Sequence, residues 1–162
     1  MRWFRCAACG HDWAEGPATS TEWASFRHMI VTANETTRPA RFRVVFVDDD
    51  AASRSGYAAY LDRCGFEVYA VGSGEEALTV AADCAPNVVV LDLGLPDTDG
   101  WEVARRLKGS PTTAAVPIIA LTGAMLPHER ASAMRAGCDR YLTKPCVPTD
   151  LLQAIRQCLG CE

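Results

Sequence analysis

The chain reads VVVLDLGLPDTDGWEV over residues 88–103. Most of the segment Asn87–Leu91 is an unbroken aliphatic run, which predicts a strand that is covered on both faces. Asp92 follows that run directly. Asp99 with Glu102 then fits the N-terminal cap of a helix, because these residue types accept hydrogen bonds from the first free N–H groups. The stretch therefore predicts one β-strand and one α-helix with acidic residues between them.

The same alternation recurs along most of the chain. Five strands are expected. Four of them are Phe42–Val47, Phe66–Val71, Asn87–Leu91 and Pro117–Leu121, and the fifth contains Tyr141 and Leu142. Between them Ser73 with Glu76 fits a capping box, and Pro127 and Gly137 fit the two ends of a further helix. Pro148 precedes a last helix. This order predicts an α/β fold, a doubly wound five-stranded parallel sheet with helices on both faces.

Composition narrows the class of protein. The chain has 162 residues, of which 49% are hydrophobic and 22% charged, as is typical of globular proteins. Its first ten residues lack the apolar run of a secretory signal, and no apolar stretch comes near the ~20 residues that span a bilayer. The net charge of −4 argues against a nucleic-acid partner. We therefore expect a cytoplasmic protein that contacts neither membranes nor nucleic acid directly.

The first 40 residues differ from the rest. They hold three of the four tryptophans, and their last part, residues 32–40, is polar and contains a proline. Such a composition is typical of a linker. We therefore predict an extension and linker over residues 1–40 and one domain over residues 41–162.

Chemically distinctive residues follow four of the expected strands. These groups are Asp48-Asp49-Asp50, Asp92, Thr122-Gly123 and Lys144-Pro145. Each taken alone has an ordinary explanation as an acidic turn, a helix cap or a loop. In parallel α/β sheets, however, ligands bind outside the carboxyl ends of the strands. The joint occurrence of these groups at the correct strand ends therefore predicts a site on that rim.

The residue types of this rim suit phosphoryl transfer. Three carboxylates close together repel one another unless a cation lies among them, and Mg²⁺ prefers oxygen ligands. An Asp carboxylate can attack phosphorus and form an aspartyl phosphate. A lysine and a threonine hydroxyl nearby can stabilise the oxygens of the transferred group.

Five stretches together resemble receiver domains of response regulators, of the CheY-like kind. They are VVFVDDD (44–50), GSGEEAL (72–78), VVVLDLGLPDTDGWEV (88–103), VPIIALTG (116–123) and AGCDRYLTKP (136–145). The resemblance runs from about residue 41 to residue 159, roughly three-quarters of the chain. It implies a flavodoxin-like (βα)₅ fold with strand order 2-1-3-4-5.

The resemblance also implies roles for individual residues. Asp92 is implied as the phosphoacceptor, Thr122 as the hydroxyl that closes on the phosphoryl group and Lys144 as its cationic partner. Tyr141 matches the aromatic switch position, and Pro145 follows a peptide bond that is often cis in the family. Four magnesium ligands are implied, the first through water and the last through its backbone carbonyl: Asp48, Asp49, Asp92 and Gly94.

The implied function is two-component phosphorelay signalling. A histidine kinase or phosphotransfer protein would donate the phosphoryl group, Mg²⁺ would be the cofactor, and the switch would change the affinity for an unknown downstream protein. On this interpretation the chain is a phosphoacceptor signalling domain and not an enzyme. Because the sequence stops at Glu162, just past the last expected helix, we expect a stand-alone receiver.

Two other functions remain as alternatives. A phosphorylation-independent interaction module on the same fold would be favoured if an active residue were missing, and none is. A Mg²⁺-dependent phosphohydrolase with an Asp nucleophile usually has a second Asp two residues later, where this chain has Gly94. The order of the acidic groups along the chain also fits the receiver better.

The chain has eight cysteines, and four of them form two C-x-x-C pairs. Cys6 and Cys9, with His11 close by, resemble half of a zinc ribbon, and Cys158 and Cys161 lie at the other end of the chain. A structural zinc ion needs four ligands, so the two pairs could share one ion, or a homodimer could combine one pair from each chain. The other four are expected to be small apolar packing residues: Cys64, Cys84, Cys138 and Cys146.

Overall fold

A computed structural model describes these residues: 3–5, 12–14, 41–123 and 135–161. The chain divides into two compact units, Met1–Ala40 and Arg41–Glu162. In the first unit, strands β1 (Trp3–Arg5) and β2 (Asp12–Ala14) pair antiparallel. The sequence did not predict this pair, because three residues are too short for an alternating pattern to be recognised.

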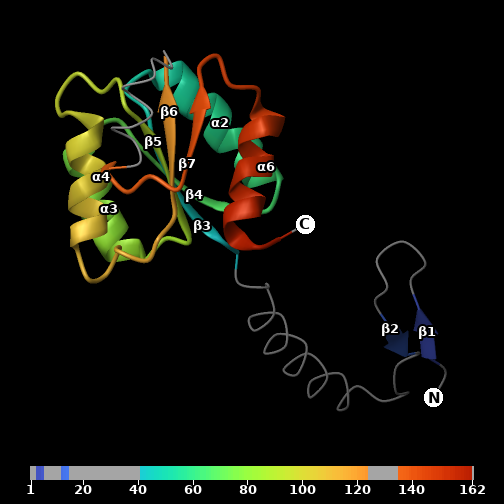
Figure 1. The fold of residues 1–162 in the computed structure, drawn as a ribbon. Helices are drawn as coiled ribbons and strands as arrows, with labels where there is room; N and C mark the ends of the chain where they lie inside the picture. The colour runs from blue at the N-terminus through green and yellow to red at the C-terminus, as the bar shows by residue number, and fades with distance from the viewer. Residues whose placement is uncertain (1–2, 6–11, 15–40, 124–134, 162) are drawn as a thin grey trace. The chain divides into compact units, whose positions relative to one another are not determined.

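The second unit is built on one parallel sheet (Figure 1). Its strands are β3 (Arg43–Val47), β4 (Glu67–Val71), β5 (Val88–Asp92), β6 (Ile118–Thr122) and β7 (Arg140–Thr143). Their order across the sheet is β4-β3-β5-β6-β7, and every neighbouring pair is parallel. Counted along this unit, that order is 2-1-3-4-5, so the predicted fold class and strand order are confirmed.

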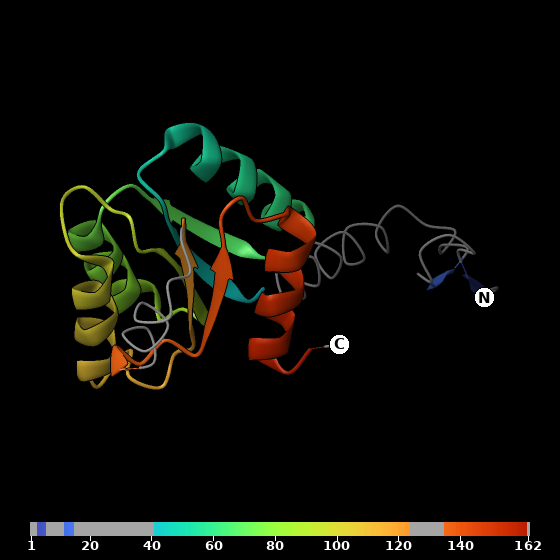
Figure 2. The same cartoon turned by 45° about the horizontal axis from the view of Figure 1, so that its top comes forward.

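Helices cover both faces of the sheet, as predicted. In Figures 1 and 2, α2 and α6 lie on one face, and α3 and α4 lie on the other. Their bounds are Ala51–Arg63 for α2, Gly74–Cys84 for α3, Gly100–Gly109 for α4 and Pro148–Leu159 for α6. Most of the helix expected between Pro127 and Gly137 falls outside the described residues. Its expected stop, Gly137, has a φ of 86°, the left-handed conformation that glycine adopts without strain.

The core forms two layers because side chains alternate across each strand. On β3, Val44 and Phe46 belong to the apolar cluster that also contains residues of α2 and α6. Val45 and Val47 belong to the cluster on the other face, with residues of α3 and α4. The central strand β5 is buried along its whole length. The prediction that this aliphatic run is covered on both faces is therefore confirmed.

Local hydrogen bonds at helix starts agree with the capping pattern. Ser73 accepts a hydrogen bond from the Glu76 N–H at 3.2 Å, although the Glu76 carboxylate accepts from the Gly72 N–H rather than completing the reciprocal bond to Ser73. Asp99 accepts from the Trp101 N–H at 3.0 Å. These caps fix where α3 and α4 begin and therefore how they leave the sheet.

The start of α4 packs closely on the segment that follows β5. A Cβ atom on Gly100 would lie 2.6 Å from the Cα of Leu93 and 3.0 Å from the backbone oxygen of Asp92. No side chain fits at that distance. Glycine at position 100 therefore lets α4 hold the backbone directly after Asp92.

Among the described residues, no helix is both long enough and apolar enough to span a bilayer.

Helix α2 carries one fully buried side chain. Leu61 has no exposed surface and is the only buried residue of α2. Replacing Leu61 with Ala should lower the free energy of unfolding by about 3–5 kcal/mol, because the neighbours only partly fill the cavity. Urea denaturation measures this loss. The matched change Arg63→Ala, at an exposed position of α2, should cost less than about 0.5 kcal/mol. Equal effects of the two changes would show that α2 is not anchored through Leu61.

Candidate functional site

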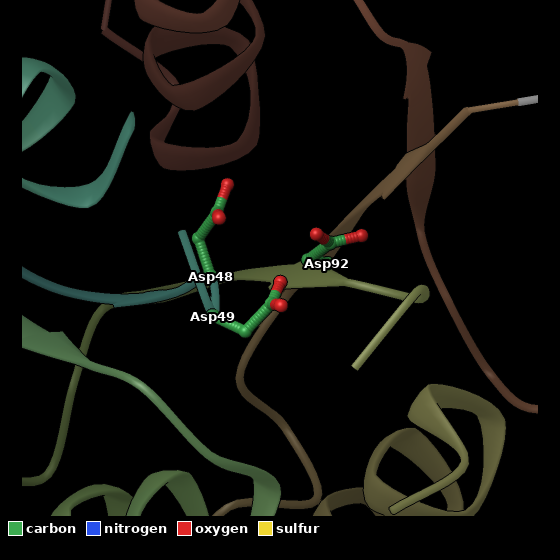
Figure 3. Close-up of side chains that lie close together, drawn as sticks. All are labelled: Asp48, Asp49 and Asp92. Carbon is green, nitrogen blue, oxygen red and sulfur yellow. The ribbon is translucent and has the colours of Figure 1, made fainter. Parts of the chain in front are cut away.

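Two neighbouring strands bring three carboxylates to one rim of the sheet. Asp48 and Asp49 follow β3 directly, and Asp92 is the last residue of β5 (Figure 3). One oxygen from each carboxylate lies within 4.8 Å of the others. Asp48 has no exposed surface, Asp92 is 5% exposed, and Asp49 is exposed to solvent. The cluster is therefore buried on one side and open to solvent at Asp49.

Asp48 is held from several directions. Its Oδ1 accepts a hydrogen bond from the Asp50 N–H at 2.9 Å. Its Oδ2 accepts from the Ser53 hydroxyl at 3.0 Å and from the Lys144 ammonium at 2.9 Å. These charge-assisted bonds compensate for burying a carboxylate, which would otherwise be costly.

The Asp92 carboxylate accepts two of the hydrogen bonds described here, one fewer than Asp48. Its Oδ2 accepts from the Lys144 ammonium at 2.6 Å, and its Oδ1 accepts from the Gly94 N–H at 2.9 Å. The sequence predicted that Asp92 follows the strand Asn87–Leu91 directly. It is the last residue of β5 instead, because its backbone still pairs in register with Leu121 on β6.

Lys144 joins the two acidic strands electrostatically. It follows β7, and its ammonium group pairs with both Asp48 and Asp92. Burial alone would lower the pKa of Lys144, but the hydrogen bonds and charges of Asp92 and Asp48 together raise it. The ammonium therefore stays protonated at neutral pH. The Lys144–Pro145 peptide bond is cis.

The donor set fits a magnesium ion. Mg²⁺ prefers hard oxygen ligands and commonly takes one or two carboxylates while keeping several waters. Asp48, Asp49 and Asp92 offer only oxygen atoms, and a single lysine faces them in the contacts described above. The three carboxylates thus retain excess negative charge, which a divalent cation would neutralise.

Thr122 lies on β6, which is paired with β5, and Tyr141 lies on β7, the next strand of the sheet. Thr122 was expected after the fourth strand but is the last residue of β6, because its carbonyl accepts a bond from the Lys144 N–H at 2.7 Å and so continues the pairing. Tyr141 lies on β7 opposite Ala120 of β6. It is half-buried and lines a surface groove between β7 and α6.

Helix α2 contributes contacts that the sequence analysis missed. Besides Ser53, the Arg54 guanidinium donates to the backbone carbonyls of Asp48 at 2.7 Å and Asp49 at 3.2 Å. The Tyr57 hydroxyl donates to the Cys146 carbonyl at 2.5 Å, in the loop after Lys144. An N-cap at Asp50 would have been the signal for these roles, since it places the following turn of α2 beside the strand end.

Most of the cysteines that the structure describes pack in or against the apolar clusters. Four pack against the apolar clusters or belong to them, so the packing prediction is confirmed: Cys64, Cys84, Cys138 and Cys146. Burial raises the pKa of Cys138 to about 11, which keeps this thiol protonated. Cys158 also packs against the α2–α6 cluster, and the Cys161 thiol donates to the Leu159 carbonyl.

The remaining zinc candidates lie elsewhere in the chain. Cys6, Cys9 and His11 fall outside the described residues.

Comparison with known proteins identifies the family. Residues 44–156 match the response regulator receiver domain family. That match covers more than half of the chain, and the chain therefore belongs to this family. The resemblance proposed from the five sequence stretches is confirmed.

Relatives and solved structures agree with this assignment. The chain is 34% identical over 116 residues to the phosphate regulon transcriptional regulatory protein PhoB of Pseudomonas aeruginosa, covering 72% of this chain and 51% of PhoB. It is 38% identical over 117 residues to the response regulator MprA of Mycobacterium tuberculosis, covering 72% of this chain and 50% of MprA. The chain thus spans about half the length of these relatives.

A receiver domain of known structure superposes well on the second unit. It comes from the sensor histidine kinase PA1611 of Pseudomonas aeruginosa PAO1, with a TM-score of 0.69 and 28% identity. The match covers 75% of this chain and 99% of that one. That structure has a magnesium ion coordinated in its active-site cleft.

Removing the Lys144 charge tests the electrostatic description. In the presence of a chelator, Lys144→Met should lower the free energy of unfolding by about 1–3 kcal/mol, because two buried carboxylates lose their cation. Since the pKa of Lys144 is raised on folding, its stabilisation is present below the unfolded-state pKa of about 10.4 and is lost as pH rises through the higher folded-state pKa. Urea denaturation at pH 7 therefore records the whole effect.

A second cation serves as the control for this measurement. Arg105 pairs with Glu102 on the surface of α4, and its side chain is 55% exposed. Arg105→Ala should change the free energy of unfolding by less than about 0.5 kcal/mol. If Lys144→Met is no more destabilising than this change, the carboxylates do not depend on Lys144.

Proposed function

We propose that this chain is a phosphoacceptor of a two-component pathway, in which Asp92 receives a phosphoryl group from a histidine kinase or phosphotransfer protein. The membership of the receiver family supports this function. The observation that carries it is the pairing of the Lys144 ammonium with both Asp92 and Asp48 at a rim that is open beside Asp49. A nucleophilic carboxylate and a cation for the transferred oxygens thus lie together.

The proposed transfer uses the carboxylate of Asp92 as the nucleophile. One of its oxygens attacks phosphorus, the bond between phosphorus and the histidine nitrogen of the donor breaks, and the electron pair of that bond stays on the nitrogen. Lys144, which donates to Asp92 beforehand, then donates to an oxygen of the acyl phosphate. The Thr122 hydroxyl donates to another. The Gly94 N–H continues to orient Asp92.

Magnesium is proposed as the cofactor of this step. The ligands would be the side chains of Asp49 and Asp92, the carbonyl of Gly94 and, through water, Asp48. When bound, the ion supplies positive charge that stabilises the oxygens of the phosphoryl group during transfer. The oxygen-only donor set of the cluster supports this choice.

The output is proposed to be a change in protein binding. Phosphorylation adds negative charge at Asp92 and shifts the equilibrium between two arrangements of Thr122 and Tyr141. The groove that Tyr141 lines would change with it. Residues 41–162 would act as the receiver, in the cytoplasm, on a downstream protein, as a signalling domain that modifies only itself.

Phosphorylation of Asp92 is directly measurable. With Mg²⁺ and a small phosphodonor such as acetyl phosphate, the intact protein should gain the mass of one phosphoryl group. Asp92→Asn should abolish this gain, because an amide is a poor nucleophile, whereas Asp83→Asn, at an exposed position, should keep it. A chelator should also suppress it. An adduct that persists in the Asp92→Asn variant would refute the assignment of the phosphoacceptor.

A structural zinc ion is a separate proposal, based on the spacing of the two C-x-x-C pairs. Such an ion would take Cys6, Cys9, Cys158 and Cys161 within one chain or across a homodimer. Freshly purified, reduced protein should then retain about one zinc ion per chain after mild chelation, because each chain has four such cysteines. Cys161→Ser should lose this zinc. Cys138→Ala should retain the metal. Elemental analysis measures the content, and metal-free wild-type protein would rule out the site.

A further inference from the structure

The hydroxyl of Ser53 makes an unusual contact for a serine near the start of a helix. Serine hydroxyls in helices commonly bond to a backbone carbonyl three or four residues earlier. Here the Asp50 carbonyl accepts from the Arg54 N–H, and the Asp49 carbonyl accepts from the Arg54 guanidinium. Ser53 instead donates to Oδ2 of Asp48 at 3.0 Å.

This contact is set by the start of α2. Asp50 caps the helix and accepts from the Ser53 N–H at 2.6 Å, which fixes the backbone of Ser53. The N–H of the same Asp50 donates to Oδ1 of Asp48. One capped turn therefore supplies a donor to each oxygen of Asp48. One donor is a backbone N–H and the other is the hydroxyl of a short side chain, so both have little freedom to move. They therefore favour a single orientation of the Asp48 carboxylate.

The third donor to Asp48 is of a different kind. Lys144 has a long side chain that is 30% exposed, and it divides its ammonium between Asp48 and Asp92. If Lys144 turns towards a phosphoryl oxygen, Asp48 loses part of that contact. Among the described residues, Ser53 is then the side chain that still donates to Oδ2 of Asp48 in the contacts given above.

We propose that Ser53 is a positioning residue that orients Asp48 and thereby sets the magnesium affinity of the site. This inference rests on the proposed function, because it requires the cluster of Asp48, Asp49 and Asp92 to bind Mg²⁺. Residues that hydrogen-bond to metal-binding carboxylates orient them, and their loss commonly weakens metal binding by one or two orders of magnitude.

The test compares three variants by titration calorimetry with MgCl₂. Ser53→Ala removes the hydroxyl and should weaken magnesium binding by about tenfold. Ser53→Thr keeps a hydroxyl at the same atom position and should stay within about twofold of wild type. Ser55→Ala removes an exposed hydroxyl of the same helix and should leave the affinity unchanged.

Thermal unfolding with and without Mg²⁺ separates positioning from stability. A ligand raises the unfolding temperature according to its affinity for the folded state. Ser53→Ala should therefore show a smaller magnesium-dependent rise than wild type, whatever its unfolding temperature in chelator. If Ser53→Ala does not fold, Ser53→Cys, which carries a weaker donor, should give a reduced rise in its place.

Three results would overturn the inference. Wild-type affinity in Ser53→Ala, beside measurable binding by wild type, would overturn the role of Ser53 alone. Equal weakening in the threonine and alanine variants would show that the hydroxyl is not what matters. Absence of magnesium binding by the wild-type chain would overturn both this inference and the proposed cofactor.

Discussion

The pairing of Lys144 with Asp48 and Asp92 is the interaction on which the site depends. Carboxylates from two adjacent strands repel one another at the rim of the sheet, and two of them are almost fully buried. Such a cluster is stable only with compensating donors or cations. The strand order supplies the cation, because β7 ends on the same rim and the lysine side chain is long enough to reach across β6 to both acidic strands.

Both the sheet and the helices position the residues of this rim. The buried strand β5 fixes Asp92, and the close packing of Gly100 holds the backbone that follows it. On the other side, the capped start of α2 holds Asp48 through Asp50 and Ser53. The open side of the cluster lies at Asp49, so a buried and an exposed carboxylate are neighbours in the chain at positions 48 and 49.

The sequence predicted the architecture and the charged residues because their signals are strong and local. Unbroken aliphatic runs mark buried strands, and parallel strands bring their carboxyl ends together. Strand ends at Asp92 and Thr122 were misplaced by one residue, because backbone pairing continues past the apolar run. Ser53 and Tyr57 were missed because their contacts join separate elements. An N-cap at Asp50 indicates where α2 begins, but not which carbonyl or carboxylate a hydroxyl of that helix will meet.

The hydrogen bond from Tyr57 to the Cys146 carbonyl has a mechanical consequence. Ser53 and Tyr57 stand four residues apart on α2 and so share one face of the helix. The first contacts the acidic side of the rim, and the second contacts the loop that carries Lys144. A rotation of α2 about its axis would therefore displace the Asp48 carboxylate and the loop of Lys144 together. The rigidity of α2 thus helps to set the position of one charge relative to the other.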